Sequence, residues 1–174
     1  LGDVYKRQDM QMPIFGNILS CGGWIQVALD TNTGLKRVYL AGPPCMEAEA
    51  DGNRVVGINE EELKVPGCIS RHMEDSGLPL YISLDKDILN RSCAVTNWDQ
   101  GETQLEDVLA CIKEAASCRG IIGVDVCGED PEQEGIRASQ INQNTNREII
   151  CKLMEVCGIL LSLIHISEPT RHSL

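Results

Sequence analysis

Two compact apolar runs separated by an amphipathic stretch constrain the fold of this chain more than any other feature. Residues 78–84 (Leu-Pro-Leu-Tyr-Ile-Ser-Leu) and 120–126 (Gly-Ile-Ile-Gly-Val-Asp-Val) are apolar without strict alternation, which is typical of strands buried on both faces of a parallel sheet. Between them, apolar residues recur at helical spacing from Leu105 to Ala115, after a capping-box pattern, Thr103-x-x-Glu106. The order of these segments predicts one βαβ unit, with a right-handed crossover.

The rest of the chain continues the alternation of helices and strands. We expect a helix from about Ile18 to Leu29, strands at 38–41 and 55–58, a surface loop between 43 and 53, and a last helix from about Asn144 to Cys157 after a polar Gln, Asn and Ser loop. This pattern predicts an α/β fold, a three-layer α/β/α arrangement with a mostly parallel sheet. In such sheets ligands bind beyond the carboxyl ends of the strands, so the chemistry is expected there.

Both ends of the chain read as translated sequencing adapter. Leu1–Gln8 is the translation of one strand of a transposase adapter, and Leu161–Arg171 is the translation of its reverse complement. We therefore expect residues 1–8 and most of residues 161–174 to be artefacts, and residues 9–160 to form one α/β domain that is cut at both ends. His72 is then the one native histidine, and its polar surroundings predict a position on the surface.

Charge and cysteine content narrow the classes of partner. A net charge of -11 and a pI near 4.6 argue against nucleic acid and anionic membrane surfaces, which need clustered Lys and Arg. No apolar run reaches the length of a membrane span and the first residues do not show the basic, apolar and small-residue order of a secretory signal, so a cytoplasmic protein is expected. The nine cysteines include no Cys-x-x-Cys pair, and most have apolar neighbours, which predicts reduced thiols packed as small hydrophobes.

A pair of carboxylates follows the first apolar run. Asp85 and Asp87 stand two residues apart, so the pleat of a strand would direct both to one side while Lys86 points away. Two close anions repel, and a bound metal cation is one reason for a protein to keep both ionised. An ordinary acidic loop after a strand explains the same spacing, and the pair by itself leaves both interpretations open.

Further residues extend this pair into a recognisable pattern. Ser83-x-Asp85-x-Asp87, the Thr-Asn-Trp-Asp-Gln-Gly segment at 96–101 and the run Asp125 to Pro131 resemble the second half of the ureohydrolase family, which includes arginase, agmatinase and formiminoglutamase. The resemblance covers most of residues 79 to 131. Asp9-Met10-Gln11 also resembles the end of the family's Asp-x-His-x-Asp metal strand, whose first Asp and His would fall on adapter residues.

The resemblance implies a partial arginase-like domain with a two-metal site. By this resemblance Asp9 would ligate one metal ion, Asp85 would bridge two, and Asp87 would complete the shell of the second. The family usually binds two manganese ions, Mn2+, which activate a water for attack on the planar carbon of a guanidinium, amidine or related small molecule. Asn97 and Asp99 would line the substrate pocket, with Glu129 as a further substrate contact, although an ordinary loop rich in turn-forming residues explains the 96–101 segment as well. A homo-oligomer is compatible with the intact parent protein.

Several departures from the family pattern bear on function. The chain has no Gly-Gly-x-His segment, no Asp-x-His, and only Cys21 or Gly22 near the place of the family's catalytic histidine. The position at which arginases hold the guanidinium with a Glu is Gly128 here, with Glu129 one place on, so arginine specificity does not follow. Three hypotheses result: a parent enzyme that hydrolyses non-peptide carbon-nitrogen bonds, a metal-binding or interaction module that has lost catalysis, and an inactive fragment. For the fragment we expect weak binding of a single hard ion and marginal stability.

Overall fold

A computed structural model describes residues 24–42, 54–73, 77–129 and 136–157. The chain divides into two compact units, Leu1–Glu62 and Leu63–Leu174. None of the described helices is both long enough and apolar enough to cross a membrane. Asp9 and the predicted loop at 43–53 lie outside the described residues.

The first unit pairs two parallel strands. Its elements are α1 (Trp24–Thr31), β1 (Val38–Gly42) and β2 (Val55–Asn59), and α2 (Glu60–Leu63) follows directly. Strand β1 pairs with β2 in parallel, and the two strands begin opposite each other at Val38 and Val55. Ile25 and Leu29 of α1 pack with Val55 in a small apolar core, as expected when a helix covers one face of a sheet. The predicted strands are confirmed, and the predicted helix is confirmed over its described part.

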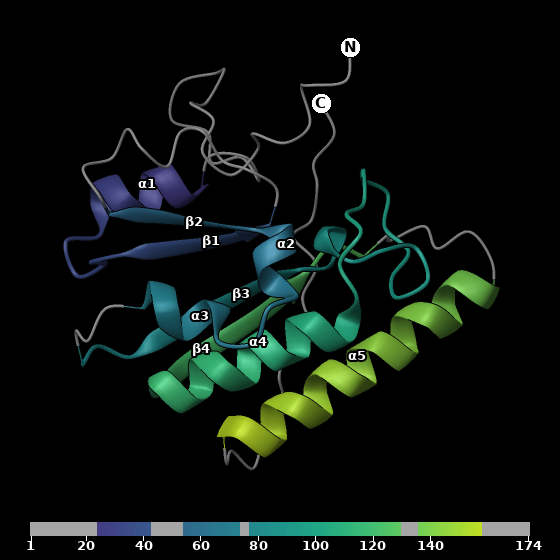
Figure 1. The fold of residues 1–174 in the computed structure, drawn as a ribbon. Helices are drawn as coiled ribbons and strands as arrows, with labels where there is room; N and C mark the ends of the chain where they lie inside the picture. The colour runs from purple at the N-terminus through teal and green to yellow at the C-terminus, as the bar shows by residue number, and fades with distance from the viewer. Residues whose placement is uncertain (1–23, 43–53, 74–76, 130–135, 158–174) are drawn as a thin grey trace, which may run out of the picture. The chain divides into compact units, whose positions relative to one another are not determined.

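The second unit contains the βαβ arrangement that the sequence predicts. Its elements are α3 (Cys68–His72), β3 (Leu80–Asp85), the 3-10 helix η3 (Lys86–Ile88), α4 (Leu105–Cys118), β4 (Ile121–Cys127) and α5 (Ile136–Cys157). Strands β3 and β4 pair in parallel, and α4 connects them (Figure 1). An α/β fold with parallel strands is therefore confirmed.

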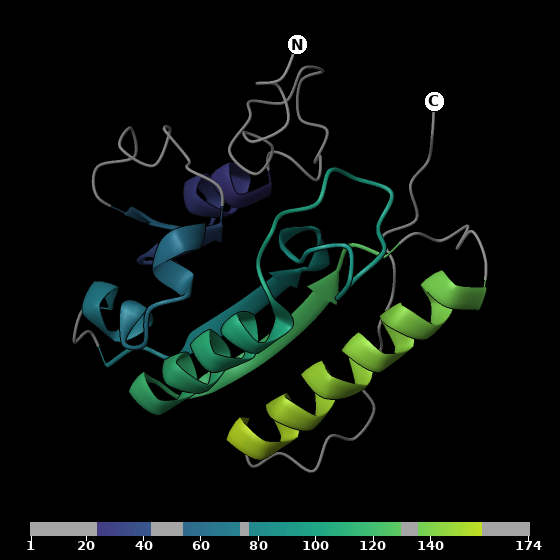
Figure 2. The same cartoon turned by 45° about the vertical axis from the view of Figure 1, so that its right-hand side comes forward.

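The core of the second unit lies between the strand pair and two helices. Figures 1 and 2 show α4 and α5 side by side along the β3 and β4 pair. Leu84 of β3 packs with Ile112 of α4 and with Ile149 and Leu153 of α5, and Val126 of β4 lies against this core. Because both helices pack on the same face of the strand pair, that face carries the alternate apolar residues of each strand.

The opposite face of this strand pair, here called the open face, carries exposed side chains among the described residues, which differs from the predicted burial on both faces. Tyr81, Ser83 and Asp85 alternate with the core residues of β3 and are exposed. The Cδ2 and Cε2 atoms of the Tyr81 ring lie next to Gly123 of β4, where an added Cβ would come within 2.6 Å of the ring. Since α4 and α5 both cover the Leu84 face, the polar residues of β3 remain accessible.

Two helix boundaries differ from the sequence prediction. The N-cap of α4 is Gln104, whereas the predicted cap, Thr103, is fully buried and forms a β-bridge with Leu89. Helix α5 begins at Ile136, so part of the predicted polar loop is helical. In both places a distant segment binds the polar residue. Thr103 pairs with Leu89, and Asn142, which is only 1% exposed, forms two hydrogen bonds with the backbone of Val95.

Candidate metal and substrate site

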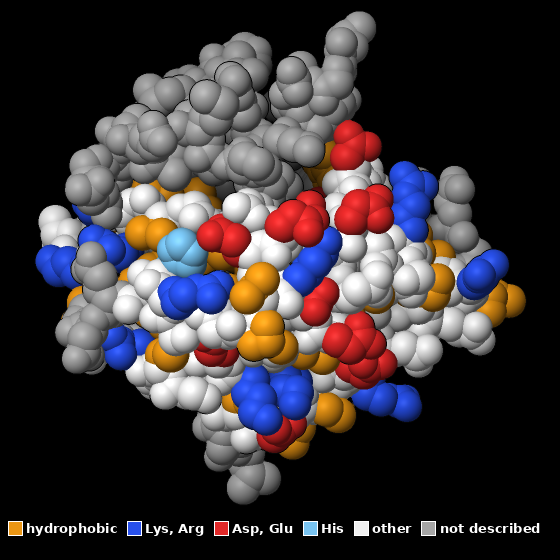
Figure 3. All heavy atoms as spheres, in the orientation of Figure 1, with side chains coloured by type: hydrophobic (Ala, Val, Ile, Leu, Met, Phe, Trp, Pro, Cys, Tyr) orange, Lys and Arg blue, Asp and Glu red, His pale blue; other side chains and the backbone are white. Residues whose placement is uncertain are grey.

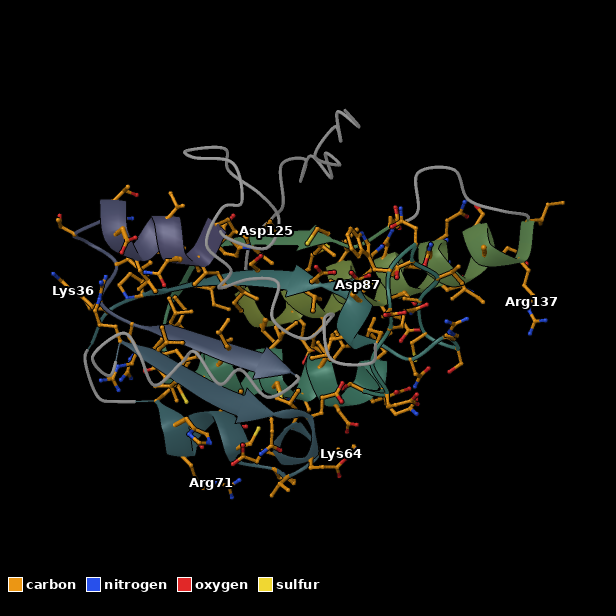
Figure 4. The ribbon with its side chains drawn as sticks, turned by 90° about the horizontal axis from the view of Figure 1, so that it is seen from above. Lys36, Lys64, Arg71, Asp87, Asp125 and Arg137 are labelled. Carbon is orange, nitrogen blue, oxygen red and sulfur yellow. The ribbon has the colours of Figure 1, made fainter. Side chains whose placement is uncertain are left out.

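The carboxyl end of β3 turns sharply at the predicted metal-binding carboxylates. Asp85 is the last strand residue and the N-cap of η3, and its Oδ1 accepts a hydrogen bond of 3.0 Å from the backbone N–H of Asp87. Asp87 therefore lies in the 3-10 turn, and the expectation that a strand pleat aligns the two carboxylates is wrong. The turn still keeps Asp85 and Asp87 adjacent, because the side chain of one caps the backbone of the other. Figure 4 shows Asp87 at this end of the sheet.

Strand β4 places a second polar row beside Asp85. The parallel register sets Ser83 opposite Asp125 and Asp85 opposite Cys127. Ser83 Oγ donates to Asp125 Oδ1 at 2.8 Å, and Figure 4 labels Asp125 on β4, away from Asp87. Burial, followed by the charge of Asp125 and a hydrogen bond to it, raises the pKa of Tyr81. The open face of the sheet thus carries linked carboxylate, hydroxyl and phenol groups.

Cys127 is held in its neutral form next to Asp85. Burial is the main cause that raises the pKa of its thiol to about 12, and the negative charges of Asp85 and Asp125 add to the effect. A thiol with so high a pKa carries its proton at neutral pH and serves as a hydrogen-bond donor to Asp85. Cys127 therefore adds a neutral hydrogen-bond donor, and no negative charge, to this edge of the sheet.

Behind the carboxylates lies a buried ion pair. Lys86 is 2% exposed, and its Nζ donates to Glu129 Oε1 at 2.6 Å and to Asn146 Oδ1 at 3.1 Å. Asn146 Nδ2 also donates to Glu129 Oε1, at 2.6 Å. Burial opposes the ionisation of Glu129, but hydrogen bonds from Lys86 and Asn146 and the charge of Lys86 outweigh it and lower the pKa of this carboxyl. The expectation that Lys86 points away from the neighbouring carboxylates is confirmed.

Gly128 brings the end of β4 against the end of β3. Its backbone has φ +84°, a left-handed conformation that favours glycine. A Cβ at this position would overlap Asp85 Oδ1 and would lie 2.9 Å from the backbone nitrogen of Lys86 and 3.2 Å from that of Asp87. The absence of a side chain at Gly128 is therefore a condition for the turn that carries the two carboxylates.

The segment with Asn97 and Asp99 is an exposed loop that closes on the same turn. Both side chains are exposed. The backbone N–H of Gly101 donates to the carbonyl of Asp87 at 2.7 Å, and Gln100 Nε2 donates at 3.0 Å to the carbonyl of Leu89. The end of the loop is thus tied to the turn with the two carboxylates, which is where a substrate-binding loop of an α/β protein is expected.

Helix α5 holds this loop in place. Asn142 donates to the carbonyl of Val95 at 2.8 Å and accepts from its N–H at 2.9 Å, and Thr145 donates to the carbonyl of Cys93. Thr145 and Asn146 lie three and four residues after Asn142, so both are on the side of the helix that carries Asn142. One face of α5 therefore holds both the loop and the ion pair of Lys86.

The structure links several of the predicted site residues to the turn after β3. Asp85 and Asp87 are adjacent, Asn97 and Asp99 lie in the loop tied to them, and Glu129 is engaged by Lys86. Within the described ranges, no three His, Cys, Asp or Glu side chains are grouped so that they could hold a metal ion. Carboxylate oxygens are donors that suit Mn2+ and Mg2+, so the pair fits part of such a shell.

The sequence reasoning missed the residues that support this site. The sequence predicts only that Lys86 points away from the two aspartates and that the last helix includes position 146, and it assigns neither Lys86 nor Asn146 a role in the site. A lysine directly after an apolar strand, between two aspartates, was the available signal, because a buried lysine requires an anionic partner. On the face that Figure 3 shows, Lys and Arg side chains are scattered among Asp and Glu.

The chain shares its fold with solved structures of ureohydrolases. It is similar to the proclavaminate amidino hydrolase from Streptomyces clavuligerus, with a TM-score of 0.70 and 19% sequence identity, over 88% of this chain and 53% of that one. It is also similar to a hypothetical agmatinase from Burkholderia thailandensis, with a TM-score of 0.64 and 17% identity, over 87% and 49% of the two chains. The fold is a partial arginase-like fold. The chain spans about half the length of these two structures.

Comparisons of sequence alone give no match. No protein-family model and no curated protein sequence matches the chain. The likeness therefore rests on the fold, and at identities of 17% and 19% it extends no further than the fold.

Proposed function

We propose that the chain is part of a binuclear metal-dependent hydrolase that acts on non-peptide carbon-nitrogen bonds of guanidino, amidino or formimino compounds. The observation that carries this proposal is the position of Asp85 and Asp87. They lie together at the carboxyl end of β3, in a chain whose fold is that of an amidino hydrolase and an agmatinase. Ligands of α/β sheets bind at this end of the strands.

Asp85 and Asp87 are the residues that would hold the metal, with Mn2+ as the proposed ion. Asp9 is proposed as a third ligand from outside the described residues. When bound, such ions supply Lewis acidity and make water a nucleophile at neutral pH. The protein's own contribution is to keep two carboxylates adjacent. The N–H of Asp87 donates to Asp85 Oδ1 and so orients this carboxylate.

The loop at 96–101 is proposed to contact a small-molecule substrate. Asn97 and Asp99 are exposed and can offer an amide and a carboxylate to a planar, nitrogen-rich group. The bond from Gly101 to the carbonyl of Asp87 ties the loop to the metal-binding turn. A substrate held by this loop would therefore lie next to the carboxylate pair.

The test is metal-dependent hydrolysis by the whole protein that carries this chain. The protein is stripped with a chelator, reloaded with Mn2+ and assayed for release of urea, ammonia or formamide from guanidino, amidino and formimino compounds. We expect activity to require Mn2+ and to be lost in Asp85→Asn. The amide retains an acceptor oxygen for the N–H of Asp87, so the turn remains while the ligand charge disappears.

Asp30→Asn is the matched control, since it makes the same chemical change at an exposed residue of α1. Equal loss of activity in both variants would contradict the proposal. Mn2+ binding that requires Asp85 but releases no product from any of these compounds would instead favour the metal-binding module. The engagement of Glu129 by Lys86 is the observation that favours this second candidate, because it removes one carboxylate from the substrate pocket.

A further inference from the structure

The turn with the two candidate metal ligands is anchored from behind by a buried lysine. Lys86 stands between Asp85 and Asp87 in sequence, and its side chain is 2% exposed. Removing an ammonium group from water is costly unless a charged partner and further hydrogen bonds compensate. Glu129 and Asn146 supply both at 2.6 Å and 3.1 Å, so the lysine has a fixed place and direction.

Three elements converge on this one backbone segment. Glu129 follows β4, Asn146 lies on α5, and Lys86 is the first residue of η3. The same Oε1 atom of Glu129 accepts from both Lys86 and Asn146, so the three side chains form a closed set of hydrogen bonds. Gly128 meanwhile allows β4 to approach the backbone of Lys86. The turn is therefore hydrogen-bonded through the Lys86 side chain, and Gly128 packs against its backbone.

We propose that Lys86, Glu129 and Asn146 form a positioning triad for the Asp85 and Asp87 carboxylates. Because Lys86 is immobilised, the residues on either side of it cannot rotate independently, and the two carboxylates keep the spacing that a metal ion requires. Glu129 acts inside the protein as the counter-ion of Lys86 and is not a free anion for a cationic substrate. This inference rests on the proposed function, because it assumes that Asp85 and Asp87 are metal ligands.

The test measures local order of the turn and affinity for Mn2+ in the same variants of the whole protein that carries this chain. Lys86→Met keeps the length and apolar stem of the side chain and removes the ammonium group. Lys152→Met is the matched control, because Lys152 forms an ion pair of 2.5 Å with Glu155 on the exposed side of α5. Asp85→Asn removes the ligand charge itself.

The first readout is amide hydrogen exchange without metal. The N–H of Asp87 is bonded to Asp85 Oδ1 and that of Leu89 to the carbonyl of Lys86, so both report on the turn. We expect Lys86→Met to accelerate exchange at these two amides while the amide of Ile112 in α4 keeps its protection. Lys152→Met is expected to change neither.

The second readout is Mn2+ binding by titration calorimetry. We expect Lys86→Met to weaken Mn2+ affinity by roughly 10- to 100-fold, the range found when groups that orient metal ligands are removed. Wild-type affinity and wild-type exchange at Asp87 in Lys86→Met would overturn the positioning triad. Unchanged Mn2+ affinity in Asp85→Asn would instead overturn the proposed metal site, so the two failures are distinguishable.

If Lys86→Met does not fold, Glu129→Gln tests the positioning triad in its place. The glutamine still offers an oxygen to Lys86 and Asn146 but lacks the charge that compensates the buried ammonium. We expect faster exchange at Asp87 and weaker Mn2+ binding than in the wild type. A folded Glu129→Gln variant with wild-type values for both would overturn the proposal.

Discussion

Gly128 offers a direct test of how tightly the ends of β3 and β4 are packed. Its left-handed φ of +84° is unfavourable for any residue with a Cβ. In addition, a Cβ here would overlap Asp85 Oδ1 and lie 2.9 Å from the backbone nitrogen of Lys86. Gly128→Ala therefore combines a backbone cost with a steric cost at one position.

The magnitude follows from these two contributions. A left-handed conformation costs an alanine about 1–2 kcal/mol. Forcing extra volume into a packed site costs about 1–3 kcal/mol, and here two of the three contacted atoms, the nitrogens of Lys86 and Asp87, belong to the backbone, which yields little. We therefore expect Gly128→Ala to lower the free energy of unfolding by about 2–5 kcal/mol, a large share of the roughly 5–15 kcal/mol of a typical domain.

Two other glycines separate the contributions. Gly67 has φ +82° but its nearest neighbour to an added Cβ, Ser70 Oγ, is at an ordinary 3.8 Å, so Gly67→Ala isolates the backbone cost. Gly120 has no atom within 4 Å of an added Cβ, so Gly120→Ala is expected to be close to neutral. The measurement is urea unfolding followed by circular dichroism. If Gly128→Ala loses no more stability than Gly67→Ala, the close approach of β4 to the carboxylate turn is refuted.

Three further predictions concern the groups around this site. Asn142→Ala should destabilise the protein in urea unfolding, because each backbone group of Val95 that it leaves buried without its partner costs about 1–3 kcal/mol. Since folding lowers the pKa of Glu129, its contribution to stability is present above its unfolded pKa of about 4.3 and is lost as the pH falls through the lower folded pKa. The difference in unfolding free energy between wild type and Glu129→Gln should accordingly shrink from pH 6 to strongly acidic pH in urea titrations, and a constant difference would contradict the ion pair. Burial and the neighbouring thiol of Cys68 raise the pKa of Cys111 to about 12, so in the native protein iodoacetamide should alkylate exposed Cys151 well before Cys111 by mass spectrometry, and equal rates would argue against that burial.

The sequence was most informative where one local pattern decides one element. The apolar runs of β3 and β4 and the helical spacing of α4 predicted all three elements and their parallel pairing. An intervening helix returns the chain to the same end of the sheet, so the strands must run parallel. The place of Asp85 at the carboxyl end of β3 followed from the same pattern.

Local pattern failed where a distant partner decides the outcome. Residues before Asn144 were predicted as a loop because they are polar, yet Asn142 is buried in α5 by its bonds to Val95. Thr103 was predicted as a helix cap, yet its backbone pairs with Leu89. In the sequence, a polar residue whose hydrogen-bond partner lies in a distant segment cannot be told from a polar residue that faces solvent.

The sequence by itself determined the α/β alternation, the place of Asp85 at the carboxyl end of β3, and the position of Asp87 directly after it. Only the tertiary structure decided that Asp87 turns out of the strand and that the side chain of Lys86 is buried against Glu129 and Asn146. The partners of Lys86 lie 43 and 60 residues away, at Glu129 and Asn146. Periodicity reports on neighbours within a few residues, whereas the direction of a buried charge is set by the counter-charge that the fold brings to it.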